Sequence, residues 1–284
     1  MKILVTGIKG QLGYDVCKEL TARNIPHKGV DYDDFDITNR EAVFCAVSDY
    51  SAVIHCAAYT AVDKAEDEPD LCRKINEDGT KNLAQACKQT GAKMLYISTD
   101  YVFPGTGETA YKPHDPTAPI GVYGKTKLAG EKAVTETLDR FFIIRISWVF
   151  GINGNNFVKT MLRLGNERDT LNVVADQIGS PTYTADLAPL LCDMAASEKF
   201  GIYHATNEGE CSWADFAREI FRQAGLNTKV TPVPSSEYPT KATRPLNSRM
   251  DKTCLEEAGF ARLPRWEDAL SRFLQDLVHV NGGI

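Results

Sequence analysis

Short apolar runs alternate with longer helical patterns over the first half of the chain. The candidate strands are KILVTG, HKGVD, AVIHCA, KMLYIST and RFFIIRIS. The stretches between them, such as QLGYDVCKELTAR and DLCRKINEDGTKNLAQACKQTG, read as helices. Strands that are apolar on both faces and separated by helices indicate a parallel sheet covered on both sides. We therefore predict a doubly wound α/β fold, whose ligands bind at the carboxyl ends of the strands.

The pattern becomes less regular after Gly151. Two stretches rich in proline and glycine, FPGTGETAYKPHDPTAPIG and TPVPSSEYPTKATRP, interrupt it, and loops of this length are usually functional or mobile. Helices are still recognisable in SWADFAREIFRQAG, where Ser212 and Asp215 have capping-box spacing, and in RWEDALSRFLQDLV. We predict a doubly wound domain over residues 1–150 and a smaller, less regular lobe over residues 151–284 that mainly binds the substrate. Within residues 175–206 the chain returns to the sheet, with GIYHAT as the returning segment.

Composition and charge narrow the classes of partner. The chain has 284 residues, a formal net charge of −6 and a pI near 5.5, whereas a nucleic-acid binder needs a basic surface. No stretch approaches the roughly 18 continuous apolar residues of a membrane span, and the opening MKILVTG lacks the pattern of a signal peptide. The eight cysteines never form C-x-x-C, so neither a zinc site nor a disulfide framework is indicated. We expect a cytoplasmic protein with reduced thiols and no nucleic-acid or membrane partner.

A glycine-rich segment follows the first predicted strand. In TGIKGQLG, Gly7, Gly10 and Gly13 lie where the strand turns into a helix. Glycine there permits a tight turn, the approach of backbone N–H groups to a pyrophosphate, and close helix packing. The segment predicts that residues 1–150 form a Rossmann-type NAD(P)-binding domain. Asp31, at the end of the second strand, would bind the adenosine ribose and favour NADH, whereas Lys9 can reach the 2′-phosphate of NADPH, so the choice stays open.

Two further segments at the same edge are candidates for cofactor contacts. Asp36 and Ile37 lie in the next loop, where they can meet the adenine, although Asp36 can equally cap the helix that begins at NREAV. After the third strand, Ala57 and Ala58 would leave room for the phosphoribose part of the cofactor, and Tyr59 follows them. The alanines can equally be packing residues.

The pattern Tyr-x-x-x-Lys occurs twice, at Tyr14/Lys18 and at Tyr123/Lys127. A spacing of four places both side chains on one face of a helix, so spacing alone does not distinguish the pairs. We predict that Tyr14 and Lys18, behind the glycine loop, are a surface pair. Tyr123 begins the helix between the fourth and fifth strands, at the edge where a nicotinamide would lie. A tyrosine needs a nearby cation to lower its pKa from about 10, and Lys127 would supply it, while Thr99 adds a hydroxyl for a ketone oxygen.

The chain resembles the extended short-chain dehydrogenase/reductase family. The motifs TGIKGQLG, STDYVF and VYGKTKLAGEKAV carry this resemblance. With HCAAYTAVDKAE, RISWVFG, NNFV and DQIGSPTYTADLA added, the chain is similar, in order and over most of its length, to the dTDP-4-dehydrorhamnose reductase family. The resemblance implies that NADH or NADPH reduces the C4 ketone of a dTDP-sugar substrate, dTDP-4-dehydro-L-rhamnose.

The resemblance also implies roles for individual residues. Tyr123 would donate a proton to the C4 oxygen, Lys127 would tune the phenol and hold the nicotinamide ribose, and Thr99 would orient the ketone. Asp100 and Trp148 would lie against the sugar nucleotide, although Trp148 can equally be a core aromatic at a strand end.

Two sets of residues are candidates for phosphate contacts. By the resemblance, Gly10, Gln11 and Leu12 would cradle the cofactor pyrophosphate. The diphosphate of a sugar nucleotide is anionic and the chain is acidic, so a local cation is needed, and Arg244 in the second proline-rich loop is a bidentate candidate. Arg244 can equally be a solvated loop arginine.

Departures from related families leave alternatives open. Sugar-nucleotide dehydratases have a glutamate after the Thr-Asp pair, and Tyr101 stands there in this chain, which removes the group needed for elimination. Some relatives bind Mg²⁺ at an acidic dimer contact, so a homodimer and Mg²⁺ are both compatible with the sequence, but no metal ligands are identified. The regulatory subunit of methionine adenosyltransferase resembles the same reductases, so an NADP-binding regulatory module is one alternative. Reduction of another nucleotide-linked ketosugar is the second.

Overall fold

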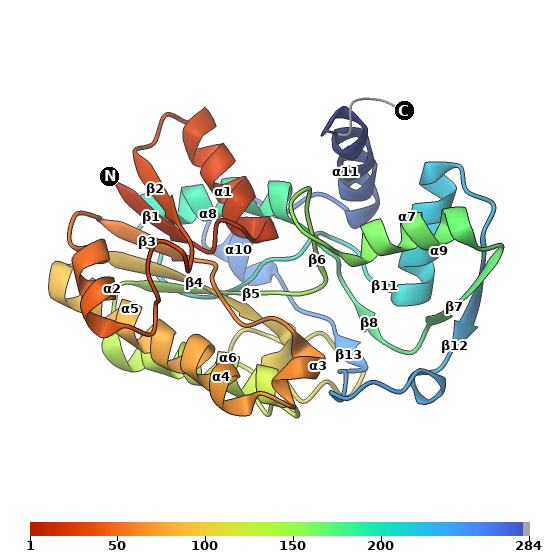
Figure 1. The fold of residues 1–284 in the computed structure, drawn as a ribbon, viewed down its shortest axis with the longest axis horizontal. Coiled ribbons are helices and arrows are strands. Elements are labelled where there is room, and N and C mark those ends of the chain that lie inside the picture. The colour runs from red at the N-terminus through yellow and green to blue at the C-terminus, as the bar shows by residue number, and fades with distance from the viewer. Residues whose placement is uncertain (281–284) are drawn as a thin grey trace.

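A six-stranded parallel sheet forms the middle layer of the larger part of the molecule, on the left in Figure 1. The computed structural model describes residues 1–280, and the strand order of this sheet is β10-β5-β4-β3-β1-β2. Each neighbouring pair runs parallel, and the order changes direction between β1 and β3, which is where a doubly wound sheet opens a crevice for ligands. The strands are β1 (Ile3–Thr6), β2 (His27–Val30), β3 (Ala52–His55), β4 (Lys93–Thr99), β5 (Phe141–Ile146) and β10 (Gly201–His204). The predicted α/β class is confirmed.

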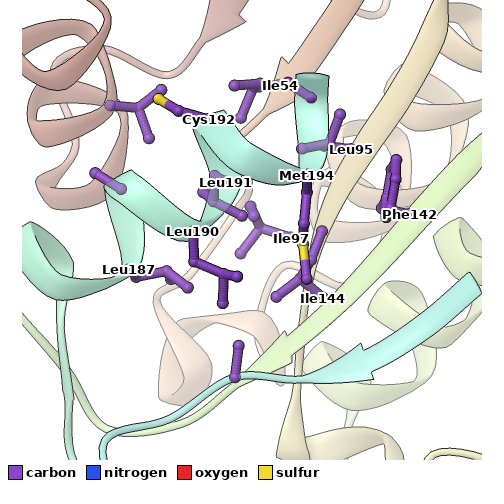
Figure 2. Close-up of a cluster of buried hydrophobic side chains, with 14 of the residues drawn as sticks. Ile54, Leu95, Ile97, Phe142, Ile144, Leu187, Leu190, Leu191, Cys192 and Met194 are labelled. Atoms are coloured by element: carbon purple, nitrogen blue, oxygen red, sulfur yellow. The ribbon is translucent and has the colours of Figure 1, made fainter. Parts of the chain in front are cut away.

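Helices cover both faces of the sheet because successive strand residues point to opposite sides and are apolar on each. On one face lie α1 (Gln11–Ala22) and α8 (Thr184–Ala196), and on the other α2 (Arg40–Val47), α5 (Thr80–Thr90) and α6 (Val122–Thr137). Figure 2 shows the first face, where side chains of α8 pack on those of the strands. Burying one such aliphatic side chain contributes roughly 1.5–3 kcal/mol. The residues labelled there are Ile54, Leu95, Ile97, Phe142, Ile144, Leu187, Leu190, Leu191, Cys192 and Met194.

A smaller lobe with an aromatic core lies beyond the sheet, around α7 and α9 (Figure 1). Phe150, Phe216 and Phe273 are buried in this core. Helix α9 begins with the predicted capping box, in which the Ser212 hydroxyl accepts a hydrogen bond from the Asp215 N–H. The lobe and its connections contain α7 (Phe157–Glu167), α9 (Trp213–Ala224), α11 (Trp266–Val280), β6 (Val149–Phe150), β7 (Thr170–Val174), β8 (Ile178–Gly179), β9 (Thr182–Tyr183), β11 (Cys211–Ser212), β12 (Lys229–Val233) and β13 (Asn247–Ser248).

The stretch from Asp70 to Gly91 is helical but is not a single α-helix. A π-helical segment, η1 (Lys74–Gly79), joins α4 (Pro69–Arg73) to α5. The wider turn places the Asn76 side chain inward, where it donates to the Tyr59 carbonyl and accepts from the Tyr59 N–H. The remaining short elements are α3 (Val62–Ala65), η2 (Asp100–Val102), η3 (Ser235–Glu237) and α10 (Thr253–Glu257).

The chain passes between the sheet and the lobe more than once. Helix α8 packs on α1, and β10 pairs with β5 at the sheet edge, so both segments beyond residue 151 belong to the sheet layers. The division at residue 150, with a mainly substrate-binding part after it, stays a prediction. Within residues 1–280, no helix is both long enough and apolar enough to cross a membrane.

Candidate active site

The glycine loop between β1 and α1 closely approaches the backbone that follows β3. Gly7 has φ of +76°, and a Cβ there would lie 2.6 Å from the Ala57 nitrogen. A Cβ on Gly13 would lie 2.3 Å from the Gly7 carbonyl oxygen, so helix α1 can begin here only without a side chain at that position. No side chain caps α1, and its first turn carries no acidic residue. The free N–H groups and the partial positive charge of this 12-residue helix fit a pyrophosphate.

Acidic residues surround the end of β2. The Asp31 carboxylate accepts the Lys9 N–H at 2.9 Å and thereby ties the glycine loop to β2. The Lys9 ammonium forms an ion pair with Asp33 and lies 5.0 Å from the centre of the Tyr32 ring. The positive charge that could meet a 2′-phosphate is therefore already paired with a carboxylate.

The first cavity, of about 810 Å³, runs along the carboxyl edge of the sheet from this loop to α6. Its walls include most of the residues predicted for the cofactor and the chemistry, namely Gly7, Gly10, Gln11, Leu12, Asp31, Asp36, Ile37, Ala57, Ala58, Thr99, Asp100, Tyr123, Lys127 and Trp148. Asp36 also accepts hydrogen bonds from the Thr38 N–H and hydroxyl, so it both lines the cavity and shapes the turn before α2. The actual N-cap of α2 is Asn39.

Tyr59 does not line this cavity. Its hydroxyl donates to Glu68 at 2.5 Å, which draws the ring toward α4. Its N–H donates to Asn76 at 2.8 Å. Local hydrogen bonds hold both its backbone and its side chain, and the predicted contact of Tyr59 with the cofactor stays a prediction.

Tyr123, Lys127 and Thr99 meet at the far end of the first cavity. Thr99 is the last residue of β4, while Tyr123 and Lys127 lie one turn apart at the start of α6. The Lys127 ammonium is 4.1 Å from the centre of the Tyr96 ring, and the residue is only 3% exposed. The other pair behaves differently, since Tyr14 is 45% exposed and Lys18 lies on the surface.

Burial shifts the ionisation of Tyr123 and Lys127. Burial raises the pKa of Tyr123 well above its usual value, the Asp100 charge raises it further, and the Thr99 hydroxyl offsets only part of the rise. Burial also lowers the pKa of Lys127 to about 7. Burial dominates the ionisation of both groups, so the predicted lowering of the phenol pKa by Lys127 stays a prediction. Tyr123 stays protonated at neutral pH, which suits a proton donor.

Asp100 is a buried carboxyl at the centre of the site. It accepts a hydrogen bond from the Thr99 hydroxyl at 2.9 Å and one from the Ser248 hydroxyl of β13 at 2.5 Å. Burial raises the pKa of Asp100 to about 6, although these hydrogen bonds favour its charged form. When Asp100 binds a proton it can donate to Thr99, which frees the Thr99 hydroxyl hydrogen for a ligand oxygen.

A second cavity, also of about 810 Å³, opens toward the lobe. Arg244 lines it, donates to Asp63 of α3 at 2.6 Å and donates to the Tyr101 hydroxyl at 3.1 Å. Tyr101 and Trp148 line both cavities, so the two cavities adjoin at these side chains. Trp148 has φ of +50°, and a Cβ on Gly179 would lie 3.0 Å from its indole, so the glycine leaves room for the ring.

Several residues of the site were not identified from the sequence. Trp213 stacks on Trp148 with ring centres 3.7 Å apart, and Phe157 packs beside it. Asn153 donates to the Lys9 carbonyl and Asn156 to the Gln11 side chain, so residues after β6 support the glycine loop. Asn156 lies in the motif NNFV, which was noted only as part of a resemblance. Periodicity marks none of these positions.

Metal ligands are not gathered anywhere in residues 1–280. No group of three or more His, Cys, Asp or Glu side chains there has the arrangement to hold a metal ion. The Mg²⁺ left open by the sequence therefore has no support within this part of the chain.

A doubly wound sheet that brings a glycine loop, a Tyr–Lys pair and a neighbouring threonine into one cavity defines the extended short-chain dehydrogenase/reductase class. The profile of the family described as "RmlD substrate binding domain" matches residues 1–279. With the relatives below, this shows that the chain belongs to the dTDP-4-dehydrorhamnose reductase family.

Two relatives and one solved structure illustrate the similarity. The dTDP-4-dehydrorhamnose reductase of Streptomyces griseus is 43% identical over 94% of this chain and 91% of its own length. That of Salmonella typhimurium is 40% identical over 98% of both. The crystal structure of the Bacillus anthracis enzyme in complex with NADP superposes with a TM-score of 0.94 at 44% identity, covering 97% of this chain and 99% of the other.

Proposed function

We propose that the chain catalyses the NAD(P)H-dependent reduction of dTDP-4-dehydro-L-rhamnose to dTDP-L-rhamnose. The observation that carries this proposal is the meeting of Thr99, Tyr123 and Lys127 in one cavity with the glycine loop. The names of the relatives supply the substrate, and the NADP complex from Bacillus anthracis supports the cofactor.

The bound nicotinamide would supply a hydride to C4 of the sugar. Tyr123 would donate the proton to the C4 oxygen, and its raised pKa keeps that proton available at neutral pH. Lys127, when charged, would stabilise the phenolate that remains and hold the nicotinamide ribose. Thr99 would orient the ketone oxygen, and Asp100 would control the direction of the Thr99 hydroxyl.

The second cavity would hold the rest of the sugar nucleotide. Arg244 is the cation placed to meet the diphosphate, and its pairing with Asp63 gives it a fixed position at the wall of the cavity. Trp148 would lie against the sugar where the two cavities join.

The acidic end of β2 supports the use of NADH at least as well as NADPH. Asp31 lines the first cavity, and the Lys9 ammonium is paired with Asp33. A 2′-phosphate would therefore meet unfavourable charge, whereas ribose hydroxyls can donate to Asp31.

Mixing the purified chain with reduced cofactor and dTDP-4-dehydrorhamnose tests the proposal directly. Loss of nicotinamide absorbance, with dTDP-L-rhamnose as the product, is the expected result. A folded chain that binds the cofactor but never oxidises it, beside an active relative, would instead favour the regulatory module. Oxidation with only a different nucleotide-linked ketosugar would favour the other reductase.

A further inference from the structure

Tyr101 has a backbone fixed by the catalytic residues on both sides. It lies in η2, directly after Thr99 and Asp100, and its N–H donates to the Thr99 hydroxyl oxygen at 3.2 Å. On the other side α6 packs so closely that a Cβ on Gly124 would lie 2.3 Å from the Tyr101 carbonyl oxygen. The Tyr101 side chain therefore leaves the backbone in a direction set by β4 and α6 together.

The ring and the hydroxyl of Tyr101 contact two different functional residues. The ring meets that of Tyr123 edge to face, with centres 5.4 Å apart and planes at 77°. The hydroxyl accepts a hydrogen bond from Arg244 at 3.1 Å. The Tyr101 side chain thus contacts both Tyr123, the proposed proton donor, and Arg244, the residue proposed to bind the diphosphate. It lies where the two cavities adjoin.

Tyr101 is neutral, which suits a residue that holds its neighbours in place and does not itself donate a proton to the ketone. Burial raises the pKa of Tyr101, the Asp100 charge raises it further, and Arg244 offsets part of this rise. The phenol is neutral at working pH. Since its oxygen already accepts from Arg244, its own proton can point to an oxygen of a ligand in the cavity.

We propose that Tyr101 is a positioning residue that holds Arg244 for diphosphate binding through its hydroxyl and holds Tyr123 through its ring. The proposal rests on the proposed function. When a sugar nucleotide binds, Arg244 and the Tyr101 hydroxyl together fix the diphosphate end, and the Tyr101 ring holds the Tyr123 ring against the ketone end. The hydroxyl then contributes to binding, and the ring contributes to turnover.

Two substitutions separate these contributions. In Tyr101→Phe the ring stays and the link to Arg244 is lost, so the KM for the dTDP-sugar should rise about 5- to 10-fold while kcat stays within about twofold. In Tyr101→Leu the edge contact is also lost, so kcat should fall about tenfold as well. The matched control is Tyr50→Phe, which removes a hydroxyl just before β3, at the opposite edge of the sheet, and should change neither constant.

A double-mutant cycle with Arg244→Ala tests the coupling. If the Tyr101 hydroxyl acts mainly through Arg244, adding Tyr101→Phe to Arg244→Ala should raise KM by much less than it does in the wild type. Fully additive effects, an unchanged KM in Tyr101→Phe, or an unchanged kcat in Tyr101→Leu would each overturn the proposal.

Measuring the binding of dTDP tests the role of Tyr101 independently of the proposed reaction. Calorimetry should give a dTDP Kd that rises in Tyr101→Phe and in Arg244→Ala, with much less than full addition in the double variant, while the Kd of NADPH stays unchanged. If dTDP binding shows the coupling between Tyr101 and Arg244 but the wild type reduces no ketosugar, the proposed function is wrong and the role of Tyr101 stands. If the wild type is active and the coupling is absent, only the role of Tyr101 is wrong.

Discussion

Burial controls the ionisation of the residues at the centre of the site. Tyr123 and Asp100 both favour their neutral forms more than in water, and Lys127 loses its proton more easily, since each charged form has left solvent. The three groups lie within one cavity, so the charge on any of them affects the others. The protonation state of each group therefore depends on the charges of the other two.

The first prediction concerns Tyr123. Tyr123→Phe should lower kcat by about 10²-fold or more and leave cofactor Kd unchanged, since only the proton donor is removed. Steady-state kinetics and cofactor titration measure both quantities. Tyr14→Phe, in the exposed copy of the motif, is the matched control and should be near neutral. A large loss in the control with little loss in Tyr123→Phe would mean that the other pair acts.

The second prediction concerns pH and Asp100. Its folded pKa of about 6 lies above the unfolded value of 3.8, so the stability it contributes is present below the unfolded pKa and is lost as pH rises through about 6. Asp100→Asn should therefore raise the free energy of unfolding by roughly 1–3 kcal/mol at neutral pH, and by less near pH 4–5, while turnover falls. Urea denaturation at both pH values measures this.

An exposed carboxylate gives the control for Asp100. Asp49→Asn, on the surface after α2, should change stability little at either pH. An Asp100→Asn variant with lower stability at neutral pH would show that the two accepted hydrogen bonds outweigh the cost of burying the charge.

Helix α6 shows how an element is held in place for its functional residues. The Glu131 carboxylate accepts two hydrogen bonds from Arg145 of β5, at 2.8 and 2.7 Å, and one from Ser98 of β4 at 2.5 Å. Arg145 also donates to the Pro113 carbonyl in the first proline-rich loop. This buried network fixes α6 and the loop that leads into it against the strands.

The sequence predicts the elements of the sheet well and their side-chain partners poorly. Short apolar runs located β1, β3, β4 and β5, because burial on both faces leaves a direct mark on composition, whereas β2 is half exposed and its run is less apolar. The glycine loop and the Tyr–Lys motif were also found, because each needs particular residue types at fixed spacing. Contacts that no spacing encodes determine the pairing of Glu131 with Arg145, the π-helical segment η1 and the hydrogen bond from Tyr59 to Glu68.

The third prediction concerns the loop after β2. Asp31→Ala should improve the use of NADPH relative to NADH, because the carboxylate that repels a 2′-phosphate is gone. Asp31→Asn is the cleaner variant, since its amide oxygen can still accept the Lys9 N–H that ties down the glycine loop. The ratio of kcat/KM for the two cofactors is the measurement. An unchanged ratio in both variants would show that Asp31 does not face the ribose.

At the scale of the whole molecule, one loop connects the lobe to the sheet domain across the second cavity. In the 240–245 loop, Arg244 and the Ala242 N–H both bind Asp63, and Lys241 forms an ion pair with Asp67. The contacts join α3 to a segment far along the chain. The substrate would therefore lie between two parts of the molecule that polar contacts already hold together.

The fourth prediction concerns Arg244. Arg244→Ala should raise the KM for the dTDP-sugar at least tenfold and leave cofactor Kd unchanged, because it removes binding shared by ground and transition states. Arg218→Ala, an exposed arginine of α9, is the control and should change neither. An unchanged KM in Arg244→Ala would assign the diphosphate to another cation.

The stacked tryptophans give the protein an optical signal of its own. The chain has three tryptophans, and two of them, Trp148 and Trp213, lie face to face at 3.7 Å while Trp266 is buried in the lobe. Indoles this close share their excited states, so near-ultraviolet circular dichroism should contain a paired band that Trp213→Phe abolishes. Reduced nicotinamide absorbs where indole emits, and Trp148 borders the cavity proposed to hold it. Quenching of tryptophan fluorescence would then report cofactor arrival in real time, without any added label.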